Sequence, residues 1–288
     1  MTNCIPITVV GGYLGAGKTT LINHLLRNSA QRLAVLVNEF GELSIDEDLI
    51  EAEDDGLISI SGGCICCSFG NDLTRALINI KDSCPKFDHI MIEASGVAIP
   101  SSVSSTFQLL GGFDDHGVLV MVDAEKIIRN SENEYIGDTI DRQIEDADFI
   151  LLNKSDLIDI EELIKVKQWL MKKNTKANVF QTKNAQIPVD VALGRFEQKS
   201  CETSVFGHAD DLFETRVIKN KTVEDAHHFA ETLISSSDRL VRAKGFFKTK
   251  AGHTYLLQAV GERVVLKSVS HMPKLGISCI FIKDRKGI

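Results

Sequence analysis

The sequence predicts an α/β fold, a parallel sheet with helices on both faces, followed by a smaller α+β domain. Short apolar segments alternate with helical patterns over the first two thirds of the chain, as is typical of a parallel sheet buried on both sides. A glycine-rich turn separates the first apolar segment from the first helical pattern. Beyond a polar stretch near residue 200, several strand patterns surround one helical pattern, which indicates a second, mostly antiparallel unit.

The elements are assigned from hydrophobic periodicity. In the first domain we expect strands at residues 7–10, 33–37, 57–60, 89–92, 118–122, 149–152 and 179–180. Helices between them include one capped by Asn71 or Asp72 and one over residues 159–173. In the second domain we expect strands at 213–217, 240–247, 254–260, 263–266 and 277–282, and a helix at 222–235. Ligand-binding loops should follow the carboxyl ends of the parallel strands.

Length and charge divide the chain. Its 288 residues are enough for about two domains, and we expect them at 1–193 and 213–288, with a linker at 194–212. Residues 213–288 carry 14 Lys and Arg against 7 Asp and Glu, although the whole chain has a net charge of -8. The acidic part disfavours nucleic-acid binding, and the basic part lacks the interleaved aromatics of a single-strand binder. The basic domain is either solvated surface or a docking surface for a partner.

The turn from Gly12 to Thr19 has a glycine, four residues and then Gly-Lys-Thr. Its glycines let the backbone approach a phosphate chain, and successive N–H groups form an anion-binding nest. The following helix N-terminus adds its positive end. We expect Lys18 to pair with the β- and γ-phosphates during catalysis, and the Thr19 hydroxyl to bind Mg²⁺. The expected phosphate-binding set is Gly12, Gly15, Ala16, Gly17, Lys18, Thr19 and Thr20.

The segment Asn153-Lys154-Ser155-Asp156 directly follows a predicted strand. Its spacing is that of the Asn-Lys-x-Asp pattern with which P-loop proteins bind guanine. The Asp156 carboxylate can accept hydrogen bonds from the ring imino and exocyclic amino groups, which adenine does not offer in that arrangement. We therefore expect GTP rather than ATP, bound by Asn153, Lys154 and Asp156. The alternative is a polar loop in which Asp156 caps a helix.

Glu93 and Gly96 follow the strand predicted at residues 89–92. At this place P-loop enzymes have an acidic group that acts on Mg²⁺ through water or orients the attacking water. We assign that catalytic role to Glu93, and we expect the Gly96 N–H to contact the γ-phosphate. The alternative is a turn that caps a helix and binds no ligand.

Three of the seven cysteines are clustered at Cys64, Cys66 and Cys67, just before a predicted helix. A helix N-terminus favours thiolates, which bind metals, and three sulfurs suit Zn²⁺ or a similar thiophilic ion such as Co²⁺. Glu39, a histidine, water or a partner's ligand would be the fourth ligand. Residues 39–55 contain many carboxylates and no Lys or Arg, and among them we assign metal roles to Glu39 and, for Mg²⁺, Asp46. The alternatives are a buried thiol cluster or a redox centre.

No apolar run approaches the ~20 residues that span a bilayer, so we expect no membrane partner. The first strand begins almost at once, without the pattern of a secretory signal, so we expect a cytoplasmic protein. Seven cysteines in 288 residues are too few for a disulfide scaffold.

Together these motifs resemble the CobW-like family of metal-handling P-loop GTPases. The resemblance rests on five motifs that occur in the same order as in the family: Gly12 to Thr19, Asn38-Glu-Phe-Gly41, Gly63 to Cys67, Glu93 to Gly96 and Asn153 to Asp156. The C-terminal domain of the family is resembled by the segment Arg242 to Phe246 together with Gln258. It implies a SIMIBI-type P-loop domain and a GTP-dependent metallochaperone that delivers zinc, cobalt or a similar ion to a client metalloprotein. It also implies that the three cysteines supply the metal ligands. One departure is that Ala98-Ile99-Pro100 lacks the acidic residue that the family commonly has there.

Slow GTP hydrolysis is expected without a partner, because no arginine finger or water-positioning glutamine is evident in the sequence. Two other functions remain open at this point. A P-loop kinase acting on a small molecule is disfavoured by the guanine pattern, and a zinc-binding adaptor without turnover is disfavoured by Lys18, Thr19 and Glu93. A homodimer is possible.

Overall fold

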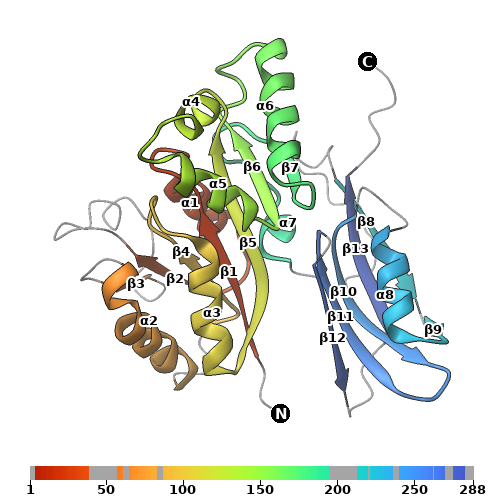
Figure 1. The fold of residues 1–288 in the computed structure, drawn as a ribbon. Coiled ribbons are helices and arrows are strands. Elements are labelled where there is room, and N and C mark those ends of the chain that lie inside the picture. The colour runs from red at the N-terminus through yellow and green to blue at the C-terminus, as the bar shows by residue number, and fades with distance from the viewer. Residues whose placement is uncertain are drawn as a thin grey trace. The chain divides into compact units, whose positions relative to one another are not determined.

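The computed structural model describes residues 4–38, 57–60, 65–82, 87–194, 213–219, 221–235, 240–261, 263–269 and 275–282. The chain divides into two compact units, Met1–Gln186 and Ile187–Ile288 (Figure 1). Residues 195–212, which hold nearly all of the expected linker, lie outside the described residues. The bounds 1–193 and 213–288 therefore stay predictions.

The first unit is built on a seven-stranded sheet in the order β3-β2-β4-β1-β5-β6-β7. All of its neighbouring strands are parallel, which confirms the expected sheet and each of its strands. Its strands are β1 Ile5–Gly11, β2 Leu33–Asn38, β3 Leu57–Ile60, β4 His89–Glu93, β5 Phe113–Asp123, β6 Phe149–Asn153 and β7 Asn178–Gln181. Its helices are α1 Lys18–Asn28, α2 Ile65–Asp82, α3 Pro100–Leu110, α4 Ile127–Ser131, α5 Gly137–Glu145 and α6 Ile160–Lys173.

Both faces of this sheet are buried. On one face, alternate residues of the central strands pack with α2, α3, α5 and α6, including Leu77, Phe107, Ile140 and Leu170. Helix α1, which follows β1, lies on the other face (Figure 1), and its Leu21 and Ile22 are fully buried. Burial of apolar side chains on both faces explains why the strands consist of continuous apolar runs. Polar side chains can therefore gather at the ends of the strands, in the loops that follow them.

The strand register brings the carboxyl ends together. Val10 of β1 pairs with Glu93 of β4, Gly11 pairs with Val120 of β5, and Asp123 pairs with Asn153 of β6. The loops that follow β1, β4, β5 and β6 therefore meet at one edge, as expected for a ligand site of a parallel sheet.

Two helix predictions need correction. Helix α2 begins at Ile65, so the expected cap at Asn71 or Asp72 is wrong, because polar residues are tolerated inside a helix and do not define its start. In α6, Asp159 caps the helix by accepting a hydrogen bond from the Glu162 N–H at 2.8 Å, so the helix expected from residue 159 begins at Ile160. None of the helices in the described part of the chain is long and apolar enough to cross a membrane.

The second unit contains a six-stranded sheet with the path β12-β11-β10-β13-β8, in which β9 pairs with β10. The strands along the path are antiparallel, and α8 packs on this sheet through Ala226 and Ala230. The expected α+β domain is thus confirmed. Its elements are α7 Val189–Leu193, β8 Phe213–Lys219, β9 Thr222–Val223, α8 Ala226–Ser235, β10 Leu240–Thr249, β11 Thr254–Val260, β12 Arg263–Val269 and β13 Gly276–Ile282.

The helix expected at residues 222–235 starts later than predicted. Thr222 and Val223 form the short strand β9 beside β10. The Asp225 carboxylate then accepts a hydrogen bond from the His228 N–H at 2.7 Å. Such a bond satisfies an N–H group at a helix start, so the capping chemistry of Asp225 locates the beginning of α8 better than apolar spacing does.

Candidate nucleotide-binding site

The loop between β1 and α1 has the backbone of a phosphate cradle. Gly12, Gly15 and Gly17 have φ angles of 127°, 76° and 107°, which favour glycine. A Cβ atom at Gly12 would lie 2.3 Å from the Met121 carbonyl oxygen, and one at Gly17 would lie 2.5 Å from Asn153 Nδ2. Conformation and close packing therefore both require glycine at positions 12 and 17.

The start of α1 carries groups that suit an anion. Gly17 occupies the N-cap position, so no side chain of the N-cap residue occupies the first N–H groups of the helix, and the first turn holds no acidic residue. Lys18 is 8% exposed, and its Nζ donates a hydrogen bond to the Gly12 carbonyl oxygen at 3.1 Å. Thr19 is partly buried and Thr20 is exposed. These groups fit the phosphate chain of a nucleotide: a helix N-terminus, a lysine and a glycine cradle. The Thr19 hydroxyl would hold Mg²⁺, and the ion would neutralise negative charge of the phosphates.

Glu93 and the loop after it lie beside this cradle. Glu93 ends β4, is 4% exposed and pairs in register with Val10 of β1. A Cβ atom at Gly96 would lie 2.5 Å from Leu14 Cδ2, so the loop after β4 packs directly on the phosphate loop. The structure thus brings Glu93 and Gly96 to the position where the sequence predicted them, although their roles in hydrolysis remain predictions.

Asn153 joins three loops. Its side chain is buried, its Nδ2 donates to the Ala16 carbonyl oxygen at 2.9 Å, and its Oδ1 accepts from the Ala185 N–H at 2.9 Å. Both partners are main-chain groups, so the amide holds the phosphate loop and the loop after β7 against the end of β6. Asn153 therefore has a structural role in joining the loops of the site, which the guanine pattern alone did not predict.

Asp156 is open to solvent and has a long contact with the loop after β7. Its side chain is 37% exposed, and Oδ2 lies 4.0 Å from Lys183 Nζ. The Ser155 hydroxyl donates to the Thr182 carbonyl oxygen at 3.0 Å. These contacts bring the loop of Thr182 and Lys183 next to Asp156. An accessible carboxylate in this position suits recognition of guanine.

Sequence analysis missed Asp123. This carboxylate ends β5 and accepts a hydrogen bond from Lys154 Nζ at 2.6 Å, with the Asp123 side chain 9% exposed. Lys154 itself has φ 59°, an unfavourable conformation for a residue with a side chain. Because Asp123 stands at the carboxyl end of a buried strand, the argument used for Glu93 and Asn153 would have found it.

We expect Asp123→Asn to weaken GTP binding about five- to tenfold, because the neutral amide forms a weaker bond to the Lys154 ammonium than the carboxylate does. Titration of the purified variant with GTP measures the change. Asp138→Asn, at an exposed residue in the first turn of α5, is the matched control and should bind GTP like wild type. Unchanged affinity in Asp123→Asn would show that the ion pair does not support the base-binding loop.

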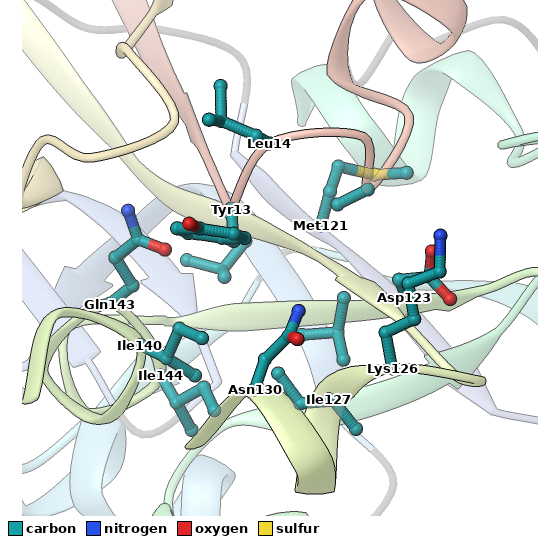
Figure 2. A pocket seen from close by; sticks show the side chains of 13 residues that line it. Tyr13, Leu14, Met121, Asp123, Lys126, Ile127, Asn130, Ile140, Gln143 and Ile144 are labelled. Atoms are coloured by element: carbon teal, nitrogen blue, oxygen red, sulfur yellow. The ribbon is translucent and has the colours of Figure 1, made fainter. Parts of the chain in front are cut away.

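A small pocket lies between the phosphate loop, the end of β5 and helices α4 and α5. Figure 2 shows Tyr13 above Asn130, with Gln143 on the same side of the pocket as the hydroxyl end of Tyr13. Asp123 and Ala16 also line it, so the pocket adjoins the predicted nucleotide site.

The expected metal residues are only partly described. Glu39, Asp46 and Cys64 lie outside the described residues. Cys66 and Cys67 are in the first turn of α2, which starts at the same edge of the sheet as α1. Among the described side chains, no group of three or more His, Cys, Asp and Glu is arranged to hold a metal.

Cys279 is separate from that cluster. It lies fully buried in the core of the second unit, and burial raises the pKa of its thiol to about 12. Cys279 therefore packs as a small apolar side chain of this core.

The fold and the site define a P-loop nucleotide-binding protein. The profile of the family described as "CobW/HypB/UreG, nucleotide-binding domain" matches residues 6–181, which is more than half of the chain. The chain belongs to this family, and it is a GTPase.

Curated relatives agree with this assignment. The chain is 28% identical over 309 residues to "Zinc chaperone CobW" of Sinorhizobium sp, covering 90% of this chain and 86% of that protein. It is 31% identical over 264 residues to "Zinc chaperone YjiA" of Escherichia coli (strain K12), covering 84% and 81%. It is 35% identical over 189 residues to "Zinc-regulated GTPase metalloprotein activator 1" of Schizosaccharomyces pombe, covering 62% and 46%. The crystal structure of Zn(II)-bound YjiA GTPase from E. coli superimposes with a TM-score of 0.51 at 25% identity, covering 99% and 96%.

Proposed function

We propose that the protein is a GTP-dependent metallochaperone that carries Zn²⁺ and transfers it to a client metalloprotein. The observation that carries this proposal is the start of α2 at Ile65. It puts Cys66 and Cys67 in the first turn of a helix at the edge of the sheet where the phosphate loop lies. The relatives named zinc chaperones and metalloprotein activator support the same cargo and the same kind of partner.

The proposed cargo site uses Cys64, Cys66 and Cys67, with Glu39 as a candidate fourth ligand. A helix N-terminus stabilises thiolates, and thiolates favour Zn²⁺ over Mg²⁺ or Ca²⁺. Three cysteines leave one position open to exchange, whereas a closed structural zinc site has four protein ligands. This donor set suits an ion that is taken up and released, and Co²⁺ is the alternative cargo.

The proposed nucleotide cycle links this cargo site to GTP. Lys18 would stabilise charge on the β- and γ-phosphates, Thr19 and Asp46 would hold Mg²⁺, and Glu93 would orient the attacking water. Binding of GTP would order the segment from Glu39 to Cys67, and hydrolysis would relax it so that the ion passes to the client. The protein would act in the cytoplasm, where thiols remain reduced.

Nucleotide turnover with and without Zn²⁺ tests the proposal against its two competitors. We expect slow release of phosphate from GTP and not from ATP, and a rate that changes when Zn²⁺ is bound. Transfer of phosphate to a small-molecule acceptor would indicate a kinase. Zinc binding without any GTP hydrolysis would indicate an adaptor and would contradict the proposed cycle.

A further inference from the structure

Gln143 of α5 is a buried amide that holds a loop far from it in sequence. Its side chain is 2% exposed. The same nitrogen, Nε2, donates to the carbonyl oxygen of Gly96 at 3.0 Å and to that of Ala98 at 2.8 Å. A primary amide has two N–H groups in a fixed plane, so both are used on one loop. A methionine or leucine would fill the same space, and burying an amide is favourable only when it is bonded.

The bonded loop is the one that packs on the phosphate loop. A Cβ atom at Gly96 would approach the Leu14 backbone nitrogen to 2.9 Å, so there is no room between the two loops at this point. The bond from Gln143 to the Gly96 carbonyl fixes the peptide plane that follows Gly96. It thereby restricts the backbone rotation next to the Gly96 N–H, which we expect to contact the γ-phosphate.

A second residue of the same region holds the far end of this loop. Asp146, directly after α5, accepts a hydrogen bond from the Ser101 N–H in the first turn of α3 at 2.9 Å. Within the loop, the Ala98 N–H donates to the Ser95 carbonyl oxygen at 2.9 Å. Residues 97–100 are all apolar and offer no side-chain acceptor or donor of their own. The groups that fix residues 96–101 from outside therefore include Gln143 and Asp146.

We propose that Gln143 is the positioning residue that presets the loop of residues 95–99 for the third phosphate of GTP. The proposal rests on the proposed γ-phosphate contact of Gly96. Gln143 acts through the loop and touches no nucleotide. By fixing the Gly96 and Ala98 carbonyls, it holds the backbone around the Gly96 N–H in one conformation before GTP binds. Without it, GTP would have to order the loop itself, at the expense of binding and of hydrolysis.

The test uses the full chain with Gln143→Met, which keeps the length of the side chain and removes both donors. We expect kcat for GTP and affinity for a non-hydrolysable GTP analogue to fall about tenfold, with affinity for GDP within twofold of wild type. Gln143→Leu, which also fills the space and has no donor, should show the same selective loss. Gln108→Met is the matched control, because Gln108 also donates a side-chain hydrogen bond, to Asp115 at 2.9 Å, but at an exposed position on α3.

The ratio of analogue affinity to GDP affinity distinguishes a positioning role of Gln143 from a general effect on the stability of the fold. Equal losses for both nucleotides, or no loss for either, would overturn the role of Gln143. Gly96→Ala, measured in parallel, tests the underlying assignment. If Gly96→Ala impairs the analogue selectively and Gln143→Met does not, only the positioning role fails. If Gly96→Ala changes neither hydrolysis nor the ratio, the γ-phosphate contact and the positioning role both fail.

Discussion

Replacement of Asp156 by alanine is expected to weaken GTP binding by about 2–4 kcal/mol, because two donors of the base are left without an acceptor in the bound state. ATP binding should hardly change, since adenine does not offer the same pair of donors. The fold should be unaffected, because the Asp156 side chain is 37% exposed and its contact with Lys183 is 4.0 Å long. Direct titration with GTP and ATP measures both effects.

A matched control lies three residues along the chain. Asp159→Ala removes the carboxylate that caps α6 and should lower the free energy of unfolding by about 1 kcal/mol while leaving GTP affinity unchanged. Asp156→Asn should behave like Asp156→Ala, because an amide presents only one acceptor atom. If the wild-type protein bound ATP as tightly as GTP, the guanine assignment would be wrong.

The double variant Cys66→Ser and Cys67→Ser is expected to lose tight Zn²⁺ binding. Serine hydroxyls are poor ligands for a thiophilic ion at neutral pH, so two of the three proposed sulfur ligands disappear. GTP binding should persist, because the phosphate cradle and Asp156 belong to other loops. Competition with a chelator of known affinity measures the zinc affinity, and release of protons on loading reports the conversion of thiols to thiolates.

Cys4→Ser controls for the loss of a thiol as such. Cys4 is a partly buried free cysteine just before β1, outside the proposed cargo site, and its replacement should leave zinc affinity unchanged. Retention of tight zinc binding in the double variant would place the cargo site elsewhere in the chain.

Much of the fold and of the nucleotide site followed from local patterns. Each strand of the parallel sheet is a short apolar run in the sequence, and the end of the run predicts where the following loop begins. Gly12 and Lys18 were found from the pattern of a glycine, four residues and Gly-Lys-Thr, Asn153 from the Asn-Lys-x-Asp pattern, and Glu93 from its place after a predicted strand. Their convergence at one edge follows from parallel pairing alone.

The missed features depend on contacts between distant segments. Gln143 is one residue among several polar residues of a helix, and only the folded chain shows its bonds to Gly96 and Ala98. The pairing of Asp123 with Lys154 joins residues 31 positions apart. The strand β9 forms because Thr222 meets Lys248, whereas its own sequence fits the pattern of the helix that follows.

The central claim is that GTP and metal are coupled, and one titration tests it most directly. Zn²⁺ is titrated against a chelator of known affinity with the full chain in three states: without nucleotide, with GDP, and with Mg²⁺ and a non-hydrolysable GTP analogue. We expect zinc affinity to be about 5- to 150-fold higher with the analogue than with GDP, and by linkage zinc must raise affinity for the analogue by the same factor. Equal zinc affinities in all three states would contradict the switch, even if the cysteines proved to be the ligands.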